Sequence, residues 1–182
     1  MSELSCEVYK KFIAGDTDSF KQIIEFYQRR VFHMGLRLFA NQFEAADFTQ
    51  DVFIKVFEQK QKYDSKRPFK SWFLTLAINL GRDYLRRRKK ICSLENAIFE
   101  PSLDSKIEQK FIQEEEQSLV QQALQVLKPK YREALVLRFE EELSIKEMAK
   151  ILGTTLGTVK SRLSRGLRIF KQAYKSLEGE KP

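Results

Sequence analysis

Hydroxyl and basic side chains recur along residues 154–177, a stretch near the C-terminus that contains no Asp or Glu. An ordinary solvated helix would carry charges of both signs. Small and basic groups on one helix face can hydrogen-bond to phosphates and base edges in a DNA major groove. The candidates are Thr158, Lys160, Ser161, Ser164, Arg165 and Arg168. The alternative is a basic exposed helix without a nucleic-acid partner.

A helix is required to present these side chains, and the sequence predicts one. At roughly 100° per residue, an apolar side forms opposite the polar side. It consists of Leu156, Val159, Leu163, Leu167 and Phe170. Ahead of it, Ser144 and Glu147 have the spacing of a capping box, Gly153 can end a short helix, and Thr154 or Thr155 can cap the next one. A short helix, a tight turn with Gly and a longer helix form the helix-turn-helix pattern.

A second basic stretch covers residues 66–90, with nine Lys or Arg and one acid, Asp83. Such a run attracts phosphates without regard to sequence. Aromatic residues and Asn79 are interleaved with it, which suits single-stranded nucleic acid, because exposed bases can stack and pair with polar groups. The alternative is that the aromatic residues, Trp72 and Phe73 among them, are core.

The helical pattern in this stretch begins after a loop, residues 63–68. Pro68 suits the first turn of a helix. One face collects the polar candidates Thr75, Asn79, Arg82 and Arg86, and Lys66 and Arg67 precede them in the loop. Trp72, Phe73, Leu76, Leu80 and Tyr84 form a core face, and Leu74, Ile78 and Leu85 form a second apolar strip. We therefore expect this helix to pack on two sides.

Residues 44–61 carry an acidic stripe on a predicted helix. Asp47, Asp51, Ile54 and Glu58 share one face, whereas Phe48, Val52 and Val56 share another. A solvated face is the simpler interpretation. The alternative is a docking face for a basic partner, with Ile54 as an apolar anchor among carboxylates. A metal site is not expected, because no His or Cys joins the carboxylates.

Groups arranged for catalysis are not found in the sequence. His33 is the only histidine, and it lies in a predicted helix beside apolar residues. There is no Gly-rich phosphate loop, no metal-ligand cluster and no nucleophile–base pairing with local support. We therefore expect no enzyme and no cofactor.

The bulk composition of the 182-residue chain fits a folded protein with a polyanionic partner. Its formal charge is +8, with 42% hydrophobic and 32% charged residues, so nucleic acid or an anionic membrane surface would fit the charge. No signal peptide or spanning segment is found, and we expect an intracellular protein. Cys6 and Cys92 have no Cys neighbours at metal-ligand spacing and are expected to be free thiols.

The elements predict an all-α fold, since helical periodicity is nearly continuous and Gly and Pro are scarce. The first helix is expected over residues 7–13, and Asp18 is expected to cap the second. Residues 91–118 carry seven acids against two lysines, with Pro101 among them, and are predicted to be an acidic linker. The chain therefore divides into residues 1–90, the linker, and a helix-turn-helix domain over residues 119–178.

These motifs, taken together, resemble the bacterial sigma-70 family, and within it the extracytoplasmic-function (ECF) group. The resemblance covers nearly the whole chain. Its strongest parts are DFTQDVFIKVF at residues 47–57, PFKSWFLTLAINLGRDYLRRRKK at residues 68–90 and LSIKEMAKILGTTLGTVKSRLSRGL at residues 143–167. Each motif alone is moderately specific, whereas their order and spacing across a short acidic linker are highly specific.

The resemblance implies a role for each candidate set. The first domain would be region 2, and its side chains Asp47, Gln50, Asp51, Ile54 and Glu58 would dock on the clamp helices of the RNA polymerase β′ subunit. The set Lys66, Arg67, Thr75, Asn79, Arg82 and Arg86 would melt and read the promoter −10 element. The C-terminal domain would be region 4 and read the −35 element through the residue 154–177 helix.

The implied partners are core RNA polymerase, through the β′ clamp helices and the β flap, and promoter DNA. An anti-sigma factor is a further partner that the resemblance allows. The implied location is the bacterial cytoplasm, without membrane insertion. Two other functions compete with this one. A plain helix-turn-helix regulator would leave the acidic stripe and the residue 68–90 helix unexplained. A DNA-processing enzyme would need a nucleophile or metal site in the first 90 residues, and none is found.

Overall fold

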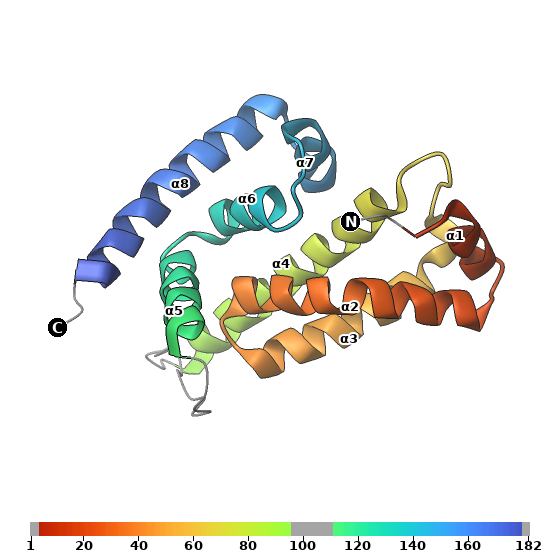
Figure 1. The fold of residues 1–182 in the computed structure, drawn as a ribbon, viewed down its shortest axis with the longest axis horizontal. Helices are drawn as coiled ribbons and strands as arrows, with labels where there is room; N and C mark the ends of the chain where they lie inside the picture. The colour runs from red at the N-terminus through yellow and green to blue at the C-terminus, as the bar shows by residue number, and fades with distance from the viewer. Residues whose placement is uncertain (1–3, 96–110, 180–182) are drawn as a thin grey trace.

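The computed structural model describes residues 4–95 and 111–179, and over these ranges its regular elements are helices. The elements are α1 (Cys6–Ile13), α2 (Thr17–Phe39), α3 (Gln42–Glu58), a 3-10 turn (Lys60–Lys62), α4 (Phe69–Glu95), α5 (Phe111–Gln125), α6 (Pro129–Phe139), α7 (Ile145–Leu152) and α8 (Leu156–Gly179). The predicted all-α class is confirmed. Figure 1 shows α1–α3 on one side of α4 and α6–α8 on the other.

The start of α2 differs from the prediction by two residues. Asp16, not Asp18, is the N-cap, and its carboxylate accepts a hydrogen bond from the Ser19 amide at 2.8 Å. Gly15 has φ of +101°, a left-handed conformation that ends the turn after α1. Asp16 directly follows that turn, so it is the first residue in position to cap the new helix.

The N-terminal half, α1–α4, has an aromatic core. Tyr27 and Phe73 stack with ring centroids 4.4 Å apart, and Phe69 stacks on Tyr9 at 4.2 Å. Phe73 is fully buried as predicted, whereas Trp72 is only half-buried and lies against Tyr63 at the rim of this core. The prediction of a core role is therefore right for Phe73 and only partly right for Trp72.

Helix α4 packs on two sides, as its two apolar strips predict. It contacts α2 and α3 as well as α6 and α7. Leu74 and Ile78 of the second strip are 2% and 1% exposed. One cluster of buried side chains therefore runs from the N-terminal half across α4 to Met148 and Ile151 of α7.

Both ends of the predicted acidic linker are helical. Helix α4 continues to Glu95, and α5 begins at Phe111. Residues 96–110 lie outside the described residues. The predicted free thiol of Cys6 is free and exposed, and the side chain of Cys92 is outside the described part.

The end of α2 is stabilised by side chains from the C-terminal half, α5–α8. Helix α2 stops at Ala40, which has φ of +56°. The last carbonyls of a helix lack partners within it. Here the Arg37 oxygen accepts from Gln125 Nε2 at 3.2 Å and the Leu38 oxygen accepts from Arg132 Nη1, while the Leu36 oxygen accepts from Gln121 Nε2 at 2.6 Å as well as from the Ala40 amide.

Candidate nucleic-acid interface

The helix-turn-helix forms from the local signals that predict it. The Ser144 hydroxyl accepts from the Glu147 amide at 3.3 Å, and the Glu147 carboxylate accepts from the Ser144 amide at 2.8 Å. Gly153 ends α7 with φ of +62°. Thr155 then caps α8 by accepting from the Thr158 amide at 3.2 Å. Thr155 is therefore the cap, where the sequence left Thr154 and Thr155 as alternatives.

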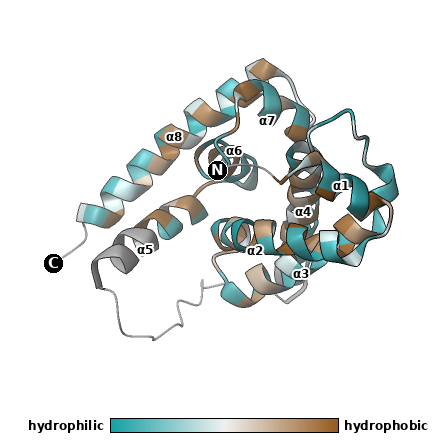
Figure 2. Cartoon of the chain, turned by 45° about the vertical axis from the view of Figure 1, so that its right-hand side comes forward, coloured by the Kyte–Doolittle hydropathy of each residue, from teal (hydrophilic) through white to brown (hydrophobic). Residues whose placement is uncertain are grey.

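Helix α8 presents the predicted polar side to solvent. Lys160, Ser161, Ser164, Arg165 and Arg168 are exposed, and Thr158 is half-buried with its hydroxyl 3.0 Å from that of Thr155. In Figure 2, hydrophilic and hydrophobic residues alternate along α8. This side can enter a groove with five exposed side chains.

The apolar side of α8 differs from the prediction at its first residue. Val159 is buried and Leu163 packs on the core, but Leu156 is half exposed. Leu156 lies in the first turn of α8, before Val159, which is the first buried residue of that helix. Gly166 is buried against α6, and a Cβ built there would lie 3.4 Å from Leu135 and Tyr131 side-chain atoms. The lack of a side chain at Gly166 lets the two helices approach closely.

Arg165 has a neighbour that the sequence did not reveal. A hydrogen bond from its guanidinium stabilises the charged form of Tyr131, which lowers the pKa of that hydroxyl. Tyr131 lies in α6, 34 residues before Arg165 in the chain, so no local sequence pattern predicts this contact. Part of the Arg165 side chain is therefore held by the protein itself.

The predicted set on α4 is gathered on one face, and that face borders the C-terminal half. Asn79 and Arg86 are exposed, while Thr75 and Arg82 are half-buried. The Thr75 hydroxyl donates to the Ser71 carbonyl at 2.7 Å, one turn earlier. A cleft of about 710 Å³ runs along this face. Its walls are Asn79, Arg82, Arg86 and Lys89 on α4, and Lys130, Glu133, Leu152 and Arg162 opposite.

Arg82 is not available to a ligand in this structure. Its Nε and Nη2 atoms both contact Glu133 Oε2, at 3.0 and 2.8 Å. Its Nη1 donates to Asn79 Oδ1 at 3.4 Å. The α4 set is therefore placed together as expected, but one of its guanidinium groups is occupied by an acid from α6.

The loop before α4 holds Lys66 and Arg67 in the open. Both side chains are exposed. Two hydrogen bonds within the loop stabilise its conformation. The Asp64 carboxylate accepts from the Lys66 amide at 3.0 Å, and the Tyr63 hydroxyl donates to the Arg67 carbonyl at 2.7 Å. This hydrogen-bonded loop places two cations at the start of α4.

The acidic stripe on α3 is exposed along most of its length. Asp47, Gln50, Ile54 and Glu58 face solvent, and Ile54 is 55% exposed. Asp51 is half-buried and accepts a hydrogen bond from the Tyr84 hydroxyl at 2.6 Å. The stripe is thus an exposed face in which one carboxylate, that of Asp51, is held by a hydrogen bond from α4.

Two aromatic residues extend this stripe and were missed from the sequence. Phe43 is 73% exposed and Phe57 is 44% exposed. The spacing of helical residues places Phe43, Asp47, Gln50, Ile54 and Phe57 in one row. Counting that row outward from Ile54 would have found both. Exposed apolar groups in a row with carboxylates are typical of a protein-docking face.

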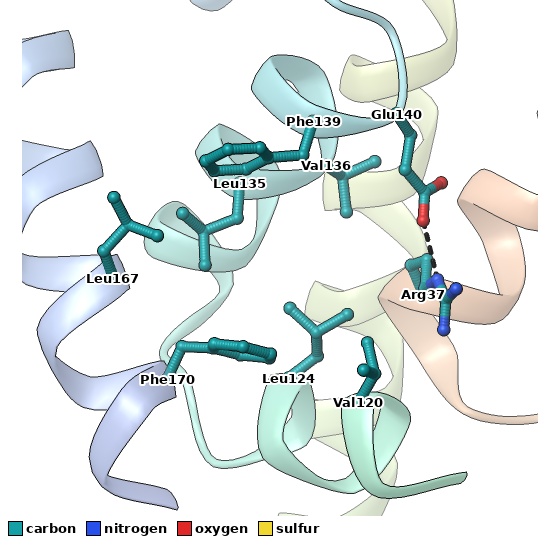
Figure 3. Close-up of a pocket in the computed structure, with 9 residues that line it drawn as sticks. All are labelled: Arg37, Val120, Leu124, Leu135, Val136, Phe139, Glu140, Leu167 and Phe170. Atoms are coloured by element: carbon teal, nitrogen blue, oxygen red, sulfur yellow. Dashed lines mark hydrogen bonds and ion pairs between the residues drawn. The ribbon is translucent and has the colours of Figure 1, made fainter. Parts of the chain in front are cut away.

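An apolar hollow of about 230 Å³ lies between α5, α6 and α8 (Figure 3). Its lining residues are Arg37, Val120, Leu124, Leu135, Val136, Phe139, Glu140, Leu167 and Phe170. Phe139 is 60% exposed. The ion pair between Arg37 and Glu140 stands at its edge. The hollow can accept an apolar side chain from a partner.

Groups of three or more His, Cys, Asp or Glu that could hold a metal ion are absent from the described residues. Within those same ranges, no helix is long and apolar enough to cross a membrane.

Comparison with known proteins places both halves in related families. Residues 23–91 match the family described as Sigma-70 region 2, and residues 117–169 match the family described as Sigma-70, region 4. The ECF RNA polymerase sigma factor SigW of Bacillus subtilis (strain 168) is 29% identical over 178 residues, which cover 92% of this chain and 95% of that protein. The RNA polymerase sigma factor SigV of the same strain is 30% identical over 131 residues, which cover 72% of this chain and 76% of that protein.

A solved structure has a similar fold. It is the sigma factor RpoE in complex with the anti-sigma factor NepR from Bartonella quintana, with a TM-score of 0.72 and 24% identity. The match covers 86% of this chain and 96% of that chain. The similarity extends across both halves of the fold.

Proposed function

Because this chain belongs to the extracytoplasmic-function group of the sigma-70 family, we propose that it reads a promoter with two separate helices. It is an alternative sigma factor that directs promoter-specific transcription, as its relatives do. In the proposal, α8 reads the −35 element, and α4 with the residue 63–68 loop reads and helps to open the −10 element. Residues 1–90 act as region 2, residues 91–118 as the linker and residues 119–178 as region 4.

The observation that carries this proposal is the presence of three different faces in one chain. The α8 face is small and basic, which suits duplex DNA. The α4 face combines Asn79 with arginines, which suits an unpaired base and its backbone. The α3 face combines carboxylates with Phe43, Ile54 and Phe57, which suits a basic protein partner. A regulator that binds duplex DNA alone would need only the first face.

The proposed protein partner is core RNA polymerase. Asp47, Gln50, Asp51, Ile54 and Glu58 would contact its β′ clamp helices, and the apolar hollow of Figure 3 would accept the β flap. An anti-sigma factor is a further proposed partner, since the similar RpoE structure contains one. The protein would act in the bacterial cytoplasm, and the reaction chemistry would belong to the polymerase.

In vitro transcription with core polymerase and a genomic promoter library tests this function. We expect transcripts from a limited set of promoters that share −35 and −10 sequences. A native gel with core polymerase separates the sigma factor from a plain helix-turn-helix regulator, since only the sigma factor forms a complex without DNA. Absence of both the complex and the transcripts would refute the proposal.

A further inference from the structure

Leu156 is a half-exposed apolar side chain in the first turn of α8. Its exposed fraction is 50%, whereas Val159 is fully buried and Leu163 packs on the core. A single exposed leucine is common on protein surfaces, and this one is distinguished by its place. It precedes Lys160 by four residues, so it lies one turn before a side chain of the polar side. An apolar group therefore borders the polar side at the end of the helix where that side begins.

The next residue, Gly157, is a glycine that the interior of the protein does not require. Its φ is not positive, and a Cβ built there would have the Thr155 hydroxyl, at 4.0 Å, as its nearest neighbour. Glycine is a poorer helix former than alanine. At roughly 100° per residue, Gly157 lies in the middle of the polar side, in line with Ser161 and Arg168. A glycine at such a point lets a surface from outside the protein approach the backbone.

The other side chains of this turn are hydroxyls that bond within the protein. Thr155 caps the helix through the Thr158 amide, and the two threonine hydroxyls lie 3.0 Å apart. Helical side chains tilt toward the N-terminus of their helix. Leu156 therefore covers part of the end of α8, beside the open backbone at Gly157. Whatever meets this end of the helix meets an apolar group there.

The chemistry of a leucine selects one base in a DNA major groove. The N-terminal residues of a recognition helix are the ones that contact base edges. Leucine has no group that could donate or accept a hydrogen bond, and thymine is the base that presents a methyl group in this groove. Residues 154–177 contain no Asp or Glu that would repel the neighbouring phosphates.

We propose that Leu156 reads a thymine of the −35 element through contact with its 5-methyl group, while the bare backbone at Gly157 lets the base pairs approach. This inference rests on the proposed function, because it requires α8 to enter the major groove. It adds to the polar candidates on α8 a specificity-determining residue that forms no hydrogen bond.

The test replaces thymine with deoxyuridine, because the two bases differ by the methyl group alone. Promoters selected by in vitro transcription are used, and each thymine of the −35 element, on either strand, is replaced in turn. Promoter affinity is measured for the full chain assembled with core polymerase, as the parent, Leu156→Ala and Val126→Ala. Val126 is the matched control, since it is 62% exposed and lies in the turn between α5 and α6.

We expect the parent to bind about fourfold more weakly when one particular thymine is replaced, which is the change for losing one buried methyl group. Leu156→Ala should bind the thymine promoter more weakly than the parent and should be insensitive to deoxyuridine at that position. Val126→Ala should respond as the parent does. Loss of sensitivity in one variant alone isolates the contact between Leu156 and the methyl group.

Gly157→Ala tests the close approach of the backbone. Its stability in urea should equal or exceed that of the parent, because alanine favours the helix. Its promoter affinity should nevertheless fall, since the added methyl group would stand between the helix and the base pairs. Unchanged promoter affinity would overturn the part of the inference that concerns Gly157.

Two results would overturn the assignment of Leu156. One is a parent that responds to deoxyuridine at no thymine of the −35 element, a result that uses the unmodified protein and does not depend on the folding of a variant. The other is a response that persists in Leu156→Ala, which would give the methyl contact to another side chain. Failure of the proposed function is distinct, because no protein would then form a promoter complex with core polymerase on any template, and the inference would fall with it.

Discussion

The hydroxyl of Tyr84 in α4 donates a hydrogen bond to the carboxylate of Asp51 in α3 at 2.6 Å. Burial and this bond to a carboxylate raise the pKa of Tyr84 well above its usual range. Tyr84 also stacks on Phe39 with ring centroids 5.5 Å apart. Asp51 is therefore held at a fixed angle on the face proposed to bind polymerase.

Removing the hydroxyl should affect stability and docking together. Tyr84→Phe should cost about 1–2 kcal/mol of unfolding free energy, because a half-buried hydrogen bond to a charged group is lost. Core polymerase affinity should also fall. In an Asp51→Asn background, the same change should no longer alter that affinity. An equal effect in both backgrounds would mean that Tyr84 acts only through the fold.

Reversing the charge of Asp51 gives the stronger version of this test. Asp51→Lys should weaken core binding by a few kcal/mol if the carboxylate is desolvated at the interface, and less if it lies at the rim. Asp47→Lys tests a second carboxylate of the same face, one that is exposed and lacks the Tyr84 hydrogen bond in the described structure. Affinity measured by fluorescence anisotropy, with circular dichroism to check the fold, decides the outcome. An unaltered affinity for both variants would remove this face from the interface.

Asn79→Ala should reduce promoter opening more than promoter binding. Its amide can donate to and accept from an unpaired base, and extruding a base costs on the order of a few kcal/mol. Permanganate footprinting should show weaker melting on duplex templates and partial recovery on templates with a pre-melted bubble. Binding to core polymerase and to the −35 element should stay near the parent value. Full melting with an unchanged −10 preference would exclude this residue from strand reading.

Substitutions on α8 should separate base contacts from backbone contacts. Ser161→Ala and Arg165→Ala should each cost about 1–3 kcal/mol at particular base positions and relax specificity there, whereas Lys171→Ala should weaken binding evenly. Tyr131→Phe is a control for Arg165, because it removes the neighbouring hydroxyl and leaves the guanidinium. Binding to a randomised −35 library measures both effects. Uniform losses for all of these variants would assign Ser161 and Arg165 to the phosphate backbone.

The capping box at the start of α7 should make stability depend on pH. Hydrogen bonds from Ser144 hold the pKa of Glu147 below its ordinary value of 4.5. Because the folded-state pKa is depressed, the stabilisation is present above the unfolded pKa and is lost as pH falls through the folded one. Ser144→Ala should cost about 1 kcal/mol near neutral pH. The difference from the parent in urea unfolding should shrink below about pH 4.5, and a constant difference would contradict this account.

Gly35 should not tolerate a side chain. A Cβ built there would lie 3.0 Å from Ala45 Cα and Cβ, so α2 and α3 would have to separate. Gly35→Ala should therefore destabilise the fold by about 1–3 kcal/mol. Gly157→Ala is the control, since its nearest neighbour is the Thr155 hydroxyl at 4.0 Å and alanine is the better helix former. Chemical denaturation of both variants measures the difference.

Helix boundaries and helix faces in this chain follow from the local sequence. The Ser144–Glu147 spacing, Gly153, and Pro129 at the first turn of α6 act over three or four residues, so helix ends could be predicted from neighbours. The polar side of α8 and the acidic stripe of α3 follow from helical periodicity for the same reason. The residues predicted on α3, α4 and α8 therefore share helix faces, and their roles stay predictions; Phe43 and Phe57 were missed because the row was not counted to its ends.

Tertiary structure alone decided which of these faces are free. Arg82 meets Glu133 from 51 residues away, Tyr84 meets Asp51 from 33 residues away, and Arg132 meets the Leu38 carbonyl from 94 residues away. The pattern of charges and hydroxyls in the sequence indicates which kind of group a side chain can bind, but not which individual residue it contacts. Several acids in the chain could have paired with Arg82. The choice depends on how α6 and α7 pack against α4, where Leu74 and Ile78 are buried, because that packing determines which acid lies beside Arg82.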